Sequence, residues 1–144
     1  MANHQQLPNS NLPSTWEEVT AAFEDHLYQR GRSRSTITGY GSSLRNFSHF
    51  HMEELGRPGL YLSKLSVDDL QAFVQWLRRS RHFSAASINR TVSALREFAR
   101  FLLRRGWHRD DVALGLKHRR TMRKRHVQKL STKQLKGLRS AVDP

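Results

Sequence analysis

The chain has 144 residues, enough for one domain with a modest core, and it has no cysteine, which excludes disulfides and thiolate metal sites and suits a reducing cytoplasm. No apolar run approaches the roughly 20 residues that a membrane span needs. The net charge of +13, from 25 lysines and arginines against 12 acidic residues, attracts polyanions, so nucleic acid is the expected partner and an anionic membrane surface the main rival.

The first predicted helix follows a polar tail. Residues 1–13 contain no apolar segment, so we expect a disordered tail there and not a secretory signal. Ser14 and Glu17 have the spacing of a capping box, in which the serine accepts a hydrogen bond from the third helical amide and the glutamate reaches back. The helix is expected to stop at Gly31. Its apolar positions are Trp16, Val19, Phe23 and Leu27.

A second, longer helix is predicted from a cap at Ser33 or Ser35 to a loop of glycine and proline at 56–59. Gly39 and Gly41 lower its helix propensity, and either tight helix packing or close approach to a DNA groove would offset that loss. The sequence leaves both explanations open. The apolar positions are Ile37, Tyr40, Leu44 and Phe47, with Phe50 near the edge of that face.

Two further helices of similar character are predicted. Ser66 begins the third helix, and Ser84 begins a fourth that ends at Gly106. Both show apolar residues at helical spacing, which predicts one buried face on each. These positions are Val67, Leu70, Phe73, Val74, Leu77, Ile88, Val92, Leu95, Phe98 and Leu102.

The predicted fold class is all-α, because no segment alternates apolar and polar residues with the period of a strand. We expect a bundle of four helices plus a short fifth that begins at Asp110 or Asp111, so that the helical domain spans 14–116. A basic linker without acidic residues follows over 117–129. Residues 130–144 begin another helix whose apolar face lacks a partner, which predicts the start of a truncated further domain.

The fourth helix carries a cationic face opposite its apolar one. A solvated helix face usually mixes charges, whereas this face gathers cations around a single acid, Glu97, so we favour DNA contact over simple solvation. Arginine can bind guanine in a bidentate manner and asparagine can bind adenine, which makes this face a candidate for base reading. The predicted DNA contacts on it are Asn89, Arg90, Ser93, Arg96 and Arg100.

A second polar face is predicted on the second helix. Amides and hydroxyls at a helix start, with arginines just before them, are natural phosphate ligands. The cations of the linker have no fixed helical face, so we expect them to hold phosphate only. The predicted contacts are Arg32, Arg34, Ser35, Thr36, Thr38, Ser42 and Arg45 for the helix, and Arg119, Arg120, Arg123 and Lys124 for the linker.

No catalytic, metal or cofactor site is predicted. The eight histidines are scattered, and His49 and His51 fall on different helix faces. Tyr28, Tyr40 and Tyr61 could act as nucleophiles, but the sequence shows no cluster of activating groups around them. No glycine-rich phosphate loop occurs, so we expect neither a cofactor nor catalysis by this chain.

Several residue runs have a characteristic order and spacing. They are Phe23-x-x-x-Leu27, Gly31-Arg32-Ser33-x-Ser35-Thr36-Ile37-x-x-Tyr40, Leu44-x-x-Phe47, and Ser87-Ile88-Asn89-Arg90-x-x-x-Ala94-Leu95-Arg96-x-Phe98-x-x-Phe101. Together they resemble the N-terminal core-binding domain of the tyrosine recombinases, or phage integrases. The run from Leu130-Ser131 to Leu138 resembles the first helix of that family's catalytic domain, so the resemblance extends from Thr15 to about Val142.

The resemblance implies a SAM-like helical domain that forms one half of a clamp around a recombination site, with the second and fourth helices toward the major groove. It also implies that the catalytic residues of DNA integration and recombination belong to the other half, so this chain is expected to recognise a DNA sequence without cleaving it.

The expected partners are double-stranded DNA at a recombination half-site and other recombinase protomers on that DNA, with no membrane and with a monomer in free solution. The alternatives are a stand-alone helical DNA-binding regulator, a truncated competitor of a recombinase, and a membrane-surface or protein-interaction domain.

Overall fold

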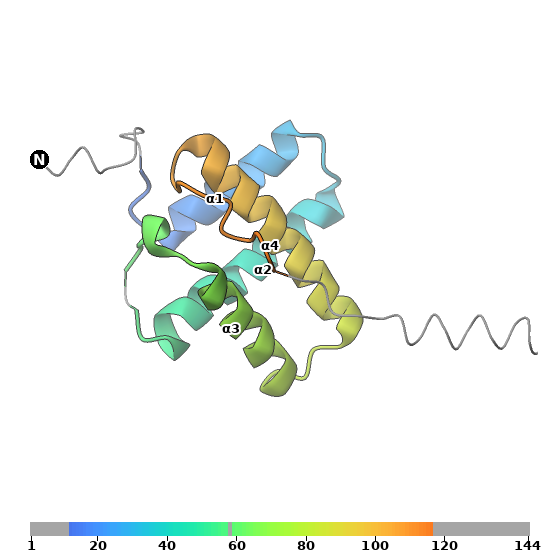
Figure 1. The fold of residues 1–144 in the computed structure, drawn as a ribbon. Coiled ribbons are helices and arrows are strands. Elements are labelled where there is room, and N and C mark those ends of the chain that lie inside the picture. Colours follow the sequence, from blue (N-terminus) through green and yellow to red (C-terminus); the bar gives the residue numbers. More distant parts are fainter. Residues whose placement is uncertain (1–11, 58, 117–144) are drawn as a thin grey trace, which may run out of the picture.

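The structure, a computed structural model, describes residues 12–57 and 59–116, and over these ranges it is helical without strands (Figure 1). Its four α-helices are α1 (Trp16–Gln29), α2 (Arg34–His49), α3 (Val67–Arg79) and α4 (Ala85–Arg105). The all-α class predicted from the sequence is therefore confirmed. The predicted linker and the helix after it lie outside the described residues, and of the predicted tail only Leu12 and Pro13 belong to them.

Short polar side chains fix where the helices begin. Ser66 and Ser84 cap α3 and α4 as predicted, and of the two serines predicted for α2 it is Ser33 that caps it. Each of the three accepts a hydrogen bond from the amide three residues further on. Helix α4 ends as predicted at Gly106, whose φ of 74° is the left-handed conformation that glycine adopts without strain. These caps explain why the sequence alone locates the starts of α3 and α4 and limits the start of α2 to two serines.

The start of α1 lies one residue later than the Ser14–Glu17 capping box predicts. Thr15 is the cap, and its Oγ1 accepts a hydrogen bond from the amide of Glu18 at 3.1 Å. The Glu18 carboxylate in turn accepts from the amide of Ser14 at 2.7 Å. The three-residue spacing occurs twice in this stretch, at 14 and 17 and again at 15 and 18, and the prediction chose the wrong pair.

After α2 the chain continues as a π-helical turn over Phe50–Glu54, which the sequence did not predict. The amide of Leu55 donates to the carbonyl oxygen of Phe50 at 3.1 Å, which is the wide spacing of a π-turn. The extra residue in this turn lets two consecutive side chains, Phe50 and His51, both face the core.

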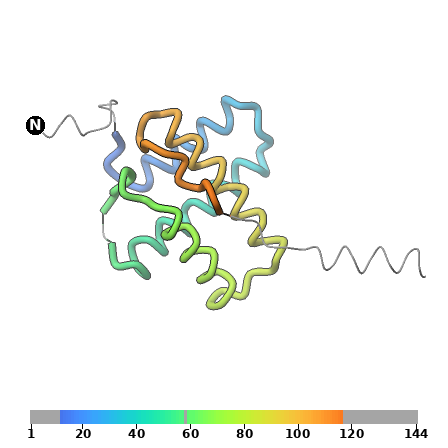
Figure 2. Tube along the Cα trace, viewed as in Figure 1, coloured from blue at the N-terminus to red at the C-terminus, as the bar shows by residue number. Residues whose placement is uncertain are grey.

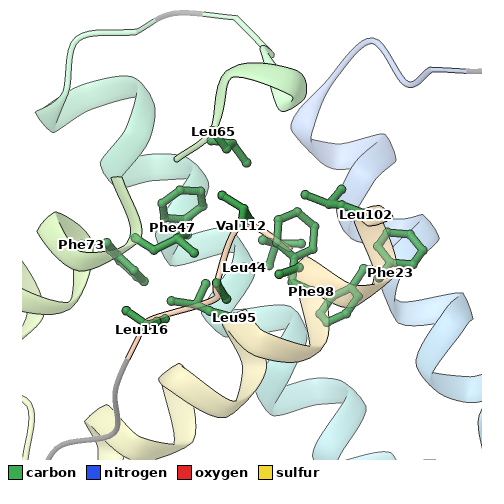
Figure 3. Close-up of a cluster of buried hydrophobic side chains, with 14 of the residues drawn as sticks. Phe23, Leu44, Phe47, Leu65, Phe73, Leu95, Phe98, Leu102, Val112 and Leu116 are labelled. Atoms are coloured by element: carbon green, nitrogen blue, oxygen red, sulfur yellow. The ribbon is translucent and has the colours of Figure 1, made fainter. Parts of the chain in front are cut away.

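The core lies where α4 packs against the other three helices (Figure 3). Figure 3 shows side chains from every helix meeting there, and the face predicted for α4 is the one that is buried. Aromatic pairs connect the helices, such as Phe23 with Phe98 at 5.4 Å and Phe47 with Phe73 at 5.3 Å between ring centroids. The labelled core residues are Phe23, Leu44, Phe47, Leu65, Phe73, Leu95, Phe98, Leu102, Val112 and Leu116.

The predicted short fifth helix is wrong. Residues 107–116, called the return segment below, fold back along α4 through turns (Figure 2). The amide of Leu114 donates to Asp111 O at 3.0 Å and that of Leu116 to Ala113 O at 2.9 Å, so the bonds span three residues and not four. The Asp111 carboxylate, expected to cap a helix, accepts from the amide of Ala113 and closes a local turn. Gly115, with φ of 95°, ends any helical continuation.

The return segment is held by its side chains and not by helical hydrogen bonds. Trp107, Val112 and Leu116 are buried in the core. The His108 Nδ1 accepts from the amide of Asp110, so its Nε2 carries the proton and donates to the carbonyl oxygen of Leu65 at 2.9 Å. The last described residues therefore belong to the bundle.

Candidate nucleic-acid interface

The turn before α2 meets the middle of α4. The Arg32 guanidinium, just before α2, donates a hydrogen bond to the Glu97 carboxylate on α4 at 3.0 Å. The two faces that the sequence predicts separately, on the second and the fourth helix, therefore adjoin at this point. Because both faces are cationic, their junction concentrates positive charge on one side of the bundle.

Glu97 is the centre of this junction. Besides Arg32, its carboxylate has Arg100 NH2 at 3.5 Å, Arg30 Nε at 3.9 Å and His26 Nε2 at 3.7 Å. We call Glu97 and these four cationic or titratable residues the Glu97 cluster. A buried carboxylate needs such partners, because an unpaired buried charge is strongly unfavourable. One carboxylate facing three guanidinium groups leaves two positive charges in excess.

His26 adds no charge to the cluster at neutral pH. Burial lowers the pKa of His26 below its usual value; Glu97 opposes this shift, while the charges of Arg30 and Arg104 add to it. The ring packs against both Phe23 and Phe101, with ring-centroid distances of 6.4 and 5.0 Å. His26 therefore serves as an uncharged, aromatic wall of the cluster.

The predicted contacts at the start of α2 are mostly exposed. Arg34, Ser35, Thr38 and Ser42 all face solvent. Thr36 is half-buried and engaged within the cap, where its amide donates to Ser33 Oγ at 3.1 Å and its hydroxyl accepts from the same oxygen. This first-turn amide therefore already has a partner.

Arg45 lies on the side of α2 that faces the acidic α1. Its NH2 forms an ion pair with Glu24 at 2.9 Å. A Cβ added at Gly41 would overlap the same Glu24 carboxylate, so a larger residue there requires this flexible side chain to move. At Gly39 a Cβ would meet nothing within 4 Å, and packing therefore does not explain it.

The predicted contacts on α4 divide into outer and inner ones. Arg90 and Arg100 are exposed, and Asn89 and Ser93 are half-buried. Arg96 is half-buried, and its NH2 donates to the backbone carbonyl oxygen of Leu116 at the end of the return segment. The predicted linker contacts Arg119, Arg120, Arg123 and Lys124 lie outside the described residues.

Sequence reasoning missed Arg30 and the central position of Glu97. The signal was present, because Glu97 is the one acid on the cationic face of α4 and occurs next to Phe98, a core position. An acid placed there becomes buried and must find cations nearby. Arg30 supplies one of them from the end of α1.

Tyr61 has neighbours that the sequence did not reveal. It lines a cavity of about 590 Å³ together with His51, Arg57 and Lys64. The Arg57 guanidinium, however, is held by both carboxylate oxygens of Asp69, at 3.0 and 3.1 Å. Among the described residues no three histidine, cysteine or acidic side chains come together as a metal site, and no described helix is both long and apolar enough to cross a membrane.

Comparison with known proteins gives a consistent match. Residues 21–106 match the family model described as phage integrase, N-terminal SAM-like domain. The chain is 28% identical over 97 residues to the TnP I resolvase of Bacillus thuringiensis, covering 67% of this chain and 33% of that protein. It is 36% identical over 91 residues to the tyrosine recombinase XerD of Caulobacter vibrioides, covering 63% and 28%, and 40% identical over 96 residues to XerC of Azotobacter vinelandii, covering 66% and 31%.

The chain thus spans about a third of the length of these relatives. No solved structure matches it at a significant level.

Proposed function

We propose, since this chain belongs to the family of phage integrase N-terminal SAM-like domains, that it binds double-stranded DNA as one half of a clamp on a recombination site. The observation that carries the proposal is the junction of two cationic faces at the Glu97 cluster, with its excess of positive charge. Phosphate neutralisation by such a surface supplies most of the affinity of non-specific DNA binding.

Within this surface we assign two kinds of contact. Arg32, Arg34, Ser35 and Arg100 hold backbone phosphates, since they lie at the helix start and around the cluster. We assign base reading to the exposed Arg90 with Asn89 and Ser93 on α4, and to Thr38 and Ser42 on α2. Arg45 and Arg96 contribute less directly than the sequence predicts, because Glu24 and the Leu116 carbonyl oxygen already bind them.

The chain positions DNA and does not cut it. Its relatives are named tyrosine recombinases and a resolvase, and DNA strand exchange by the whole clamp needs a catalytic half. We further propose that the chain is a monomer in free solution and meets other protomers only on DNA. The acidic helix α1, with Glu17, Glu18 and Asp25 exposed, suits a basic neighbour better than it suits DNA.

The test is a titration of the 144-residue chain with a labelled duplex, followed by fluorescence anisotropy at two salt concentrations. Affinity should fall steeply as salt rises, and a flat response would contradict the proposal. Arg90→Ala should reduce the ratio between the affinity for a recombination half-site and the affinity for random DNA. The matched control is Arg109→Ala, which removes the same charge from an exposed residue of the return segment, outside the cationic faces of α2 and α4. It should leave that affinity ratio unchanged.

A further inference from the structure

We propose that Glu97 positions Arg30, Arg32 and Arg100 as one binding site for a single phosphate group of the DNA backbone. This inference rests on the proposed function and deepens it, because it names one phosphate site and the acid that builds it. The three arginines come from three places in the chain: the end of α1, the turn before α2, and the middle of α4.

The geometry places the acid beneath the cations. The Glu97 side chain is only 8% exposed, whereas the side chains of Arg30, Arg32 and Arg100 are 42%, 40% and 54% exposed. Each guanidinium has a nitrogen within 4 Å of the carboxylate, at 3.9, 3.0 and 3.5 Å respectively. A guanidinium has five N–H donors, so one directed at Glu97 leaves others for a ligand on the solvent side.

The charge of the cluster suits one phosphate. Three guanidinium groups would repel each other, and Glu97 both holds them together and balances one of their three charges. The remaining two positive charges exceed the single negative charge of a phosphodiester, whose oxygens accept charge-assisted hydrogen bonds from arginine. His26 adds an uncharged ring to the cluster, and this ring packs against Phe23 and Phe101.

An acid beside DNA can have two roles, and they predict opposite changes in DNA affinity when the acid is removed. If Glu97 only repels the DNA backbone, its removal strengthens binding. If Glu97 holds three arginines in place, its removal lets them separate and weakens binding, although the chain becomes more positive. The sign of the change therefore tests positioning against simple charge.

The experiment uses Glu97→Gln in the full 144-residue chain, a generic short duplex, and anisotropy titrations over a series of salt concentrations. We expect Glu97→Gln to weaken binding roughly tenfold and to lower the log–log salt slope by about one, since one phosphate contact is lost. If the substitution only destabilises the fold, the fraction of chains able to bind DNA falls, but the salt slope stays the same. Glu17→Gln, which removes an exposed acid at the start of α1, is the matched control and should not weaken binding.

The same substitution in a chain without the cluster's arginines tests whether the change in DNA affinity reverses. In a chain that carries Arg30→Ala, Arg32→Ala and Arg100→Ala, Glu97→Gln should strengthen binding, because Glu97 then positions no arginine and only repels the DNA backbone. Tighter binding in both backgrounds, or an unchanged slope in the wild-type background, would overturn the inference. If Glu97→Gln fails to fold by circular dichroism, Arg30→Ala and Arg32→Ala are compared singly and together, and simple addition of their effects would overturn it equally. A folded wild-type chain that binds no duplex would overturn the proposed function and this site with it.

Discussion

The Arg96 guanidinium donates a hydrogen bond to the backbone carbonyl oxygen of Leu116, twenty residues further along the chain. This contact ties the end of the return segment to the middle of α4. A residue that the sequence assigns to base reading thus has a structural role.

Arg96→Ala is therefore expected to destabilise the fold. The loss should be about 1.5–3 kcal/mol, the range for a hydrogen bond that involves a charged group. Urea unfolding followed by circular dichroism measures it. Arg90→Ala, on the exposed side of the same helix, is the matched control and should leave the unfolding midpoint in place. Equal stability of the two variants would show that the return segment is held by its buried side chains alone.

The fold was predictable wherever local chemistry decides it. Serine caps mark the starts of α2, α3 and α4, and a left-handed glycine marks the end of α4, because each cap satisfies amides or carbonyls of its own helix. The return segment was not predictable, because its conformation depends on Trp107 and Leu116 reaching a core built by distant helices. In the sequence, Asp110 and Asp111 resemble a helix cap, because the core against which this segment packs is not visible there.

The candidate site was predictable in its faces but not in its partners. Helical periodicity placed Arg90 and Arg100 on the outside of α4, where they are. Periodicity cannot show which cations from other segments will reach Glu97, because Arg30 and Arg32 meet it only after α1 and α2 pack on α4. The same limit explains Arg45, whose partner Glu24 lies 21 residues earlier in the chain.

Acid should weaken the fold through the buried His51 and the half-buried His26. Burial is the main cause that lowers the pKa of His26 and of His51 from the usual 6.5; for His51 the charge of Asp69 opposes the shift and that of Arg57 adds to it. Below about pH 6.5 the unfolded chain therefore binds more protons than the folded chain, and stability falls as pH falls toward the folded-state pKa values. Above this window neither histidine contributes a pH dependence.

The measurement compares the melting temperature at about pH 7.5 and about pH 5.5. His51→Leu should reduce the difference between them, since leucine keeps apolar contact with Trp16 and Phe47 and cannot be protonated. The matched control is His49→Gln, because His49 is exposed two residues earlier. If the difference in melting temperature between the two pH values is unchanged in His51→Leu, the effect belongs to His26 or to other groups.

Pure protein should form no covalent adduct with DNA. Tyr61 is the tyrosine to examine, since it shares a cavity with His51, Arg57 and Lys64. Arg57 is bound by both oxygens of Asp69, so its charge is already balanced and it is a poor activator of a phosphodiester. Incubation with a nicked suicide substrate and a denaturing gel gives the answer. A shifted band that disappears in Tyr61→Phe and persists in Tyr28→Phe would contradict this expectation.

Gly39 should separate the stability of α2 from its contact with DNA. A Cβ at Gly39 meets nothing within 4 Å, so Gly39→Ala should stabilise the helix by about 0.5–1 kcal/mol and raise the melting temperature. The same methyl group should weaken duplex binding, because it keeps the α2 backbone away from the groove. Anisotropy and thermal melting of one variant test both parts, and a stabilised Gly39→Ala with unchanged affinity would place Gly39 away from DNA.

Gly41, half a helical turn further along α2, provides the comparison with Gly39. A Cβ there would overlap the Glu24 carboxylate, so Gly41→Ala must displace that side chain and break its ion pair with Arg45. Since an exposed pair contributes only about 0–1 kcal/mol, its loss should offset most of the gain in helix propensity and leave the melting temperature nearly unchanged. Release of Arg45 adds an unpaired cation to α2, so duplex binding should stay equal or rise, opposite to Gly39→Ala. If both alanine variants weaken binding alike, the two glycines act through a common shift of α2 and not through direct approach to DNA.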